Sequence, residues 1–591
     1  MKKKWWIPLL IFVIIPAGLF SLRWLPDPPI VVSQETTFIT EPLTDEGLPD
    51  YFEYVRSRMR EGVTPENNAV IPLVQALGPN VVSPDIRAAW FAELGIEPLP
   101  EDGSYFVPLY DERVREKGAA WVLDPDTEKA LLGSSGDPEV DLELELWSHD
   151  SPLVQKALGN TTFESVDYED YVSEVYLEAV TNLLSSAWTS ETCPPLADWI
   201  QENAGPLDLV KQAANRSHYY SPMTSNEVPR LLGTDYPLAS KILKVARSLT
   251  LRANWHVGEG RFQEAREDIR ALHRLARLIA DSSKSLVPTF IGLVLDDLAC
   301  NAHVVLSAEP NVPPELLRQL LEDLSGLPHW QHVSRSIDQF ERLIGLETIL
   351  IAADHPESLA RLGGPGDEIV RSFWGGSINW NQVLHEVNEA YDVQVQSTQA
   401  VDGLVAQGPS DTELREVETF NKGDWWRIGI FTSRTVRSHL LAEIYETMLM
   451  PSGVNVALAQ KESNARIDLT QVALALALYR AEHGSYPESL EDLIPGQLDT
   501  IPKDTFGGGP LKYERRGEGY LLYAVGKYGI DNGGSNEDGT IVDGEWVDDI
   551  NDDETGQVDQ QGGDLVIRIP IPSWDPTPQP PSPEEPADTT P

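Results

Sequence analysis

Residues 258–282 read GEGRFQEAREDIRALHRLARLIADS, and this stretch decides the fold class. After its two glycines, apolar side chains recur every three or four positions, at Phe262, Ala265, Ile269, Leu272, Leu275, Ala276 and Ile279. That spacing places them on one face of an α-helix, with arginine and glutamate on the opposite face. The stretch therefore predicts an amphipathic helix whose apolar stripe packs against other helices.

The start of this stretch resembles the turn and second helix of a tetratricopeptide repeat, in the pattern G-E-G-R-F-x-E-A from Gly258 to Ala265. Helical repeats need several copies in register, and no second copy occurs at that period. We therefore expect a plain helical bundle or helical hairpins. A tetratricopeptide-like peptide-binding module is an alternative.

Helical periodicity continues on both sides of this stretch. It covers residues 53–60, 85–96, 196–203, 206–215, 238–256, 290–306, 313–327, 335–353, 380–395 and 433–448. A further helix is expected to begin at Pro65, after a cap at Thr64. Strand-like alternation is scarce before about residue 505. The chain is therefore predicted to be mainly α, with a linker and N-terminal helical region at 26–148 and a helical body at 149–460.

The N-terminus has the pattern of a membrane anchor. Three lysines precede an apolar run from Trp5 to Leu25, which is about the 20 residues that a bilayer-spanning helix needs. Tryptophans stand at both ends, and the lysines favour a cytoplasmic N-terminus. We expect residues 1–25 to anchor the chain in the cell membrane as a single pass, with the bulk extracytoplasmic (periplasmic). The alternative, a cleaved signal peptide, lacks an Ala-x-Ala site after Leu25.

The charge of the chain excludes one class of partner. It has 93 acidic and 45 basic residues, a formal net charge of −48. Such a surface repels nucleic-acid phosphates, so no nucleic-acid partner is expected, whereas divalent cations are favoured. The two cysteines, Cys193 and Cys300, allow one disulfide, although the apolar surroundings of Cys300 favour a buried thiol.

The C-terminal part is organised differently. Residues 465–484 predict a long helix that stops at Gly484, and Pro487 is expected to open a second, short helix. Two strands follow at 511–514 and 519–526, joined by a polar turn.

The order of motifs in this part resembles the globular domain of the major pseudopilins of type II secretion systems. The matching positions are Leu478, Tyr479, Gly484, Tyr486, Pro487, Leu490, Leu493, Pro502, Asp504, Gly507, Pro510, Tyr513, Tyr523, Gly526 and Gly529. The resemblance implies a small α+β module at 461–570, in which a helix packs against an antiparallel sheet. No prepilin cleavage site occurs near residues 2–12, and the module is far from the anchor. We therefore do not expect the chain to be processed into a filament.

Residues 528–567 contain twelve acidic residues and no lysine or arginine. Major pseudopilins carry a calcium-binding loop after their second strand, so the resemblance implies Ca²⁺ ligands in this region. The candidates are Asp531, Asn532, Asn536, Asp538 and Asp543, whose oxygens suit Ca²⁺. The spacing is not that of an EF-hand, and a solvated acidic loop is the alternative.

No catalytic motif stands out in the chain, and no catalytic residue is assigned. We predict a non-enzymatic, membrane-anchored scaffold or assembly component with protein partners at the outer membrane face, linked to secretion by the resemblance. The alternative is a membrane-anchored hydrolase with its site in the helical body. Residues 571–591 are rich in proline and acidic residues, a composition typical of disorder.

Overall fold

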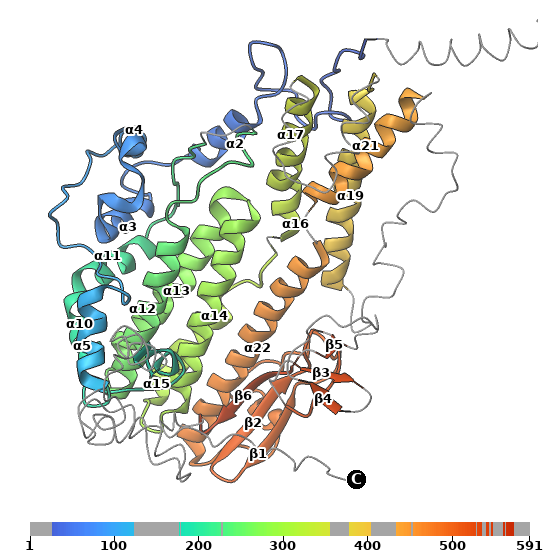
Figure 1. Ribbon diagram of the computed structural model, residues 1–591. Helices are drawn as coiled ribbons and strands as arrows, with labels where there is room; N and C mark the ends of the chain where they lie inside the picture. Colours follow the sequence, from blue (N-terminus) through green and yellow to red (C-terminus); the bar gives the residue numbers. More distant parts are fainter. Residues whose placement is uncertain are drawn as a thin grey trace, which may run out of the picture.

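The computed structural model describes residues 26–122, 176–177, 179–225, 229–331, 333–354, 377–403, 433–450, 453–527, 529–534, 539–542, 545–547, 560–561 and 563–571. Long helices lie side by side through most of it, and a small sheet packs near the end of one of them (Figure 1). The prediction of a mainly α chain with a small sheet near the C-terminus is confirmed.

The N-terminal region forms four helices and a short 3₁₀ turn. These are α2 (Tyr51–Arg60), α3 (Val70–Leu77), η2 (Pro79–Val81), α4 (Pro84–Leu94) and α5 (Glu112–Val122). The Asp50 side chain caps α2 by accepting from the backbone N–H of Glu53. The expected helix start at Pro65 is wrong. The amide oxygen of Asn68 accepts from the backbone N–H groups of Val70 and Tyr220, so α3 begins only at Val70.

The core of the helical body is a layer of long antiparallel helices. After η3 (Leu183–Ser185) come α10 (Pro194–Glu202), α11 (Ala204–Ala214), α12 (Ala239–Gly258), α13 (Phe262–Ser283), α14 (Leu286–Ala308) and α15 (Pro314–Ser325). The apolar stripe of residues 258–282 lies on α13, and all its members except the half-buried Phe262 are buried. Helices α13 and α14 approach closely, because a side chain at Gly292 would meet the backbone of Ala276.

A second hydrophobic cluster lies beside this layer and includes α2. Its other helices are α16 (Val333–Ser336), the π-helical turn η4 (Ile337–Glu341), α17 (Arg342–Asp354), α19 (Trp380–Gly403) and α21 (Arg434–Leu449). The buried Arg342 donates to the carboxylates of Asp338 and Asp392 and to the side chain of Asn388. These bonds offset the cost of burying its charge.

Helix α22 (Gly453–His483) connects the helical body to the sheet. It packs against α14, α15 and α19, and also against β2 and β6 (Figure 1). The boundary expected at residues 460 and 461 falls inside this helix. A short 3₁₀ turn, η6 (Leu490–Leu493), follows and starts at Leu490 rather than at Pro487, because Ser489 and Asp492 form a capping box.

The main sheet has three antiparallel strands in the order β1 (Lys512–Arg516), β2 (Gly519–Ala524) and β6 (Leu565–Ile569). Tyr513 lies opposite Leu522 in the first pair, and Leu522 lies opposite Ile567 in the second. The expected hairpin is present, displaced by one or two residues. A second small sheet has the order β4 (Glu545–Val547), β3 (Gly539–Val542) and β5 (Gln560–Gln561).

The expected anchor, residues 5–25, lies outside the described residues. Among the helices that the structure describes, α14 is the one that is long and apolar enough to cross a bilayer. The most apolar part of α14 is 67% buried inside the protein, so it serves as a core helix. Cys193 and Cys300 are both unpaired and buried, as the interpretation of Cys300 as a buried thiol requires.

Candidate functional site

A hollow of about 340 Å³ opens between α13, α14 and α15. Its wall carries a concentration of cationic and imidazole side chains in a strongly acidic protein. The lining residues are Arg266, Arg270, His273, Arg274, His303, Leu320, Glu322, Asp323, Gly326 and Leu327. This hollow is the strongest candidate for a functional site.

Three arginines stand along one face of α13 and line the hollow. Arg266, Arg270 and Arg274 follow one another at intervals of four residues, which stacks them on successive turns of a helix. Arg266 donates to the carboxylate of Asp323 on α15 over 2.7 Å. Within the described part of the chain, no hydrogen bond or ion pair engages the guanidinium of Arg270 or Arg274. Two positive charges are therefore available to a ligand.

A buried histidine–aspartate pair lies behind the arginines. His273 Nδ1 lies 2.6 Å from Oδ1 of Asp296, which is fully buried on α14. Because a carboxylate only accepts, this contact fixes the proton of the imidazole on Nδ1. The other carboxylate oxygen accepts from Arg277 over 2.8 Å and from the indole N–H of Trp330 over 2.7 Å.

These donors explain the electrostatics of Asp296. Burial alone would raise the pKa of its carboxyl group, but His273, Arg277 and Trp330 together hold that pKa below its ordinary value. The guanidinium of Arg277 also lies 3.8 Å from the centre of the Trp330 ring. Asp296 therefore stays ionised and holds His273 in one orientation.

Two imidazole nitrogens on the wall of the hollow have no partner. His273 Nε2 and His303 Nδ1 are both buried, and neither makes a hydrogen bond within the described residues. The two rings lie 5.3 Å apart, and the residues are only 4% and 2% exposed. Burial, with the nearby His273 and Arg266, holds the pKa of His303 well below 6.5, so its ring is neutral at pH 7. Buried polar atoms left without a partner are rare in folded proteins and suggest a missing ligand or water.

The candidate calcium ligands are only partly described. Asp531 Oδ1 accepts from the hydroxyl of Tyr523 and from the backbone N–H of Gly533, and its Oδ2 lies 3.7 Å from the ammonium of Lys512. The backbone N–H of Asn532 donates to a carboxylate oxygen of Asp564. The other three candidates, Asn536, Asp538 and Asp543, lie outside the described residues. Within the part that is described, no three acidic, histidine or cysteine side chains are grouped as metal ligands.

Sequence reasoning missed Asp564, which lies beside this loop. It is 3% exposed, and its Oδ2 accepts from the backbone N–H groups of Asn532 and Gly534. Its Oδ1 is buried without a hydrogen-bond partner in the described part of the chain, and burial raises the pKa of the carboxyl group. An unpartnered carboxylate oxygen next to Asp531 is the kind of group that a cation would satisfy.

Sequence reasoning also missed His273 and Asp296. The available signal was the pair Asp296-Asp297 inside the apolar run of α14, because a buried carboxylate requires a partner. The partner itself comes from another helix, and the sequence pattern does not identify it.

Comparison with known proteins gives no further guide to the site. No protein-family model, curated protein or solved structure matches this chain. The functional argument therefore rests on the residues described above.

Proposed function

We propose that this chain is a membrane-anchored, extracytoplasmic binding and assembly component whose helical body holds an anionic group in the arginine–histidine hollow. One observation carries the proposal: within the described residues, two guanidinium groups without counter-ions stand beside two buried imidazole nitrogens that have no hydrogen-bond partner. A phosphate, sulfate or carboxylate group pairs with both guanidinium groups at once. The net charge of −48 makes such a local cationic site unusual in this protein.

Within this proposal, each part of the hollow has a distinct role. Arg270 and Arg274 supply charge to the anion, and the ring of His273 lies beside them on the wall of the hollow. Asp296 holds that ring in one orientation. Among the described residues of the lining there is no serine, threonine or cysteine that could act as a nucleophile, which favours binding over covalent catalysis.

The anchor and the acidic surface support the rest of the proposal. The apolar segment at 5–25 would place the helical body outside the cytoplasm, where protein partners meet it at the membrane face. The high negative charge argues against a nucleic-acid partner.

We also propose that the C-terminal module is pseudopilin-like and linked to secretion. In support, α22 packs against a small antiparallel sheet, the arrangement that the resemblance implies. The motif Asp504-Thr505-Phe506-Gly507 has a clear structural role. Asp504 accepts from the backbone N–H groups of Phe506, Gly507 and Val525, and so ties this turn to the end of β2.

Calcium is proposed as a stabiliser of this module. Among the described residues, the backbone of Asn532 contacts Asp564, and Oδ1 of Asp564, which has no hydrogen-bond partner there, fits a cation. Calcium would supply positive charge to a loop in which the carboxylates otherwise repel one another.

Thermal unfolding of the full-length, calcium-replete chain tests this part of the proposal. We expect a chelator to lower the melting temperature and Asp564→Asn to remove most of that shift. Glu514→Gln, an exposed change on β1, is the control and should leave the shift intact. A melting temperature that does not respond to the chelator would contradict the calcium site.

Equilibrium binding of phosphate and sulfate to the full-length chain tests the hollow. We expect saturable binding that is lost in the double variant Arg270→Gln/Arg274→Gln. The double variant Arg113→Gln/Arg216→Gln removes the same charge elsewhere and should bind as the wild type does. Equal weakening in both variants would show that only the total charge matters and would contradict a specific site.

The histidine–aspartate pair favours hydrolysis as a second candidate function. Asp296 orients His273 so that Nε2 could take a proton from a water molecule beside an anionic ester held by the arginines. Under this alternative, His273→Gln abolishes turnover of nitrophenyl phosphate and sulfate esters while anion binding survives. If the wild type does not turn over these esters, hydrolysis is contradicted and anion binding stands as the proposed function.

A further inference from the structure

A second cavity, separate from the arginine–histidine hollow, lies where α2, the end of α13 and the π-helical turn η4 meet. It is about 150 Å³ in volume, and Phe38, Tyr54, Arg58, Lys284 and Gln339 are among its lining residues. It shares Met59 and Ser282 with a narrower slot of about 30 Å³. The two spaces therefore adjoin one another.

The wider cavity carries positive charge. Lys284 is half-buried, and none of the described residues forms an ion pair or hydrogen bond with its ammonium group. Arg58 is exposed and lies over the ring of Tyr54 at 4.4 Å. The single carboxylate among the described residues of the lining, Asp338, is already bound by Arg342 at 2.7 Å. Two positive charges are thus left facing this space.

Unusual backbone conformations surround the same cavity. Phe38 and Lys284 are the two non-glycine residues of the described chain with positive φ, at 60° and 56°. Gln339 lies in the π-helical turn, and its buried Oε1 has no hydrogen-bond partner within the described residues. The left-handed conformation of Lys284 is the cap that ends α13, whereas strain such as that at Phe38 and π-helical turns cluster at functional sites.

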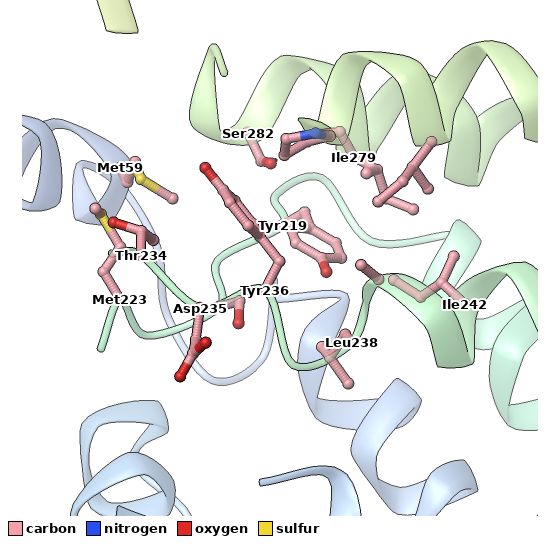
Figure 2. Close-up of a pocket in the computed structure, with 14 residues that line it drawn as sticks. Met59, Tyr219, Met223, Thr234, Asp235, Tyr236, Leu238, Ile242, Ile279 and Ser282 are labelled. Carbon is pink, nitrogen blue, oxygen red and sulfur yellow. The ribbon is translucent and has the colours of Figure 1, made fainter. Parts of the chain in front are cut away.

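The adjoining slot is apolar. Figure 2 shows Met59 and Met223 at one side of it and Ile242 at the opposite side, with Ile279 above and Leu238 below. The carboxylate of Asp235, the one charged group among the described residues of this lining, points away from the other labelled side chains. A small apolar cavity of this kind favours a few carbon atoms over water.

We propose that these two spaces form one binding site for a small amphipathic carboxylate. Lys284 and Arg58 hold its carboxylate in the wider cavity, and the end of its short alkyl chain enters the slot beside Met59. The amide of Gln339 receives a polar group or water that accompanies the carboxylate. This site is independent of the proposed function of the arginine–histidine hollow.

Ligand-observed NMR with the full-length chain in phosphatidylcholine nanodiscs tests the proposal, with empty nanodiscs as the blank. The probes are hexanoate, 3-phenylpropanoate and the uncharged hexanol. We expect saturable binding of at least one carboxylate, and Lys284→Gln should weaken it about tenfold through the loss of one charge-assisted contact. Ile242→Trp fills the slot and should abolish binding. Lys244→Gln, an exposed change on α12, is the matched control and should have no effect.

Several outcomes would overturn the proposal. These are equal binding of hexanol and hexanoate, no saturable binding of either carboxylate, and wild-type affinity in Lys284→Gln. If Ile242→Trp does not fold, the Lys284→Gln result alone decides. Displacement of hexanoate by saturating phosphate would assign the probe to the arginine–histidine hollow and contradict a second site. If phosphate does not bind to the chain at all, that result would contradict the proposal for the arginine–histidine hollow and would leave the amphipathic carboxylate site untouched.

Discussion

At the scale of single residues, the chemistry of the candidate site depends on Asp296. This carboxylate is fully buried and is the common acceptor for His273, Arg277 and Trp330. Removal of one member of a buried charge network leaves the others without a partner, which costs more than the network itself contributes. The orientation of His273 therefore depends on a residue that does not line the hollow.

Asp296→Asn should lower the free energy of unfolding by about 3–5 kcal/mol, the usual cost of breaking a buried ion pair. Asp323→Asn breaks the half-buried pair with Arg266 and is the control, with an expected loss of no more than about 1 kcal/mol. Urea denaturation at pH 7 measures both. Equal losses of unfolding free energy in the two variants would show that the buried network contributes no more to stability than the half-buried pair does.

Glu347 makes stability depend on pH. It is 8% exposed and accepts from the backbone N–H of Leu231, and burial raises its pKa from 4.5 to about 7. Between these two values the folded protein keeps a proton that the unfolded chain has released. Stability therefore falls as the pH rises through this window.

Glu347→Gln should remove that dependence. Relative to the wild type, the variant should gain about 3 kcal/mol at pH 8 and little at pH 4.5, from 1.36 kcal/mol for each unit of pKa. Denaturant titrations at several pH values provide the comparison, with the exposed Glu315→Gln as a control. If the variant gains the same unfolding free energy at every pH, the gain does not come from the raised pKa of the buried Glu347 carboxyl group.

At the scale of helices and strands, the sequence predicted the elements that are defined by a local repeat of apolar residues. The stripe of residues 258–282 predicted α13, and the same periodicity located α10, α11, α12, α14 and α15 to within a few residues at most ends. Strand β6 was missed, because its pairing partner β2 lies about forty residues earlier and only the pairing defines it. The late start of α3 was missed for a similar reason, since Asn68 bonds to the distant Tyr220.

The close approach of α13 and α14 positions both walls of the hollow. A methyl group at Gly292 would lie 2.8 Å from the carbonyl oxygen of Ala276, so Gly292→Ala should cost about 1–3 kcal/mol through overpacking. Gly205→Ala on α11 is the matched control: nothing lies within 4 Å, and a gain of up to about 1 kcal/mol is expected from helix propensity. Thermal or urea unfolding measures both, and equal effects would mean that the two helices are not in tight contact.

At the scale of the whole molecule, one hydrophobic core joins the helical body to the sheet. It extends from Ala69 on the N-terminal side to Ile569 in β6, and α22 lies along it. The sequence predicted the composition of both parts but not this continuity, which results from contacts between residues hundreds of positions apart. The partner of His273 was hidden in the same way, because it lies on a different helix.

The predicted anchor would hold the whole molecule at the membrane. We expect the full-length chain to remain with the membrane pellet after an alkaline carbonate wash, and deletion of residues 1–25 to release it. N-terminal sequencing of the cellular protein completes the experiment. A soluble protein whose first residue lies beyond Leu25 would contradict the anchor and favour the signal-peptide alternative.

The central claim is that the hollow between α13, α14 and α15 holds an anion, and anomalous diffraction from selenate tests it most directly. Selenate is a heavy analogue of sulfate, and it would be supplied to crystals at a concentration near the dissociation constant measured in solution. The account predicts an anomalous peak within hydrogen-bond distance of the guanidinium groups of Arg270 and Arg274, absent from crystals of Arg270→Gln/Arg274→Gln. An empty hollow in the wild type, or a peak that persists in the double variant, would contradict it.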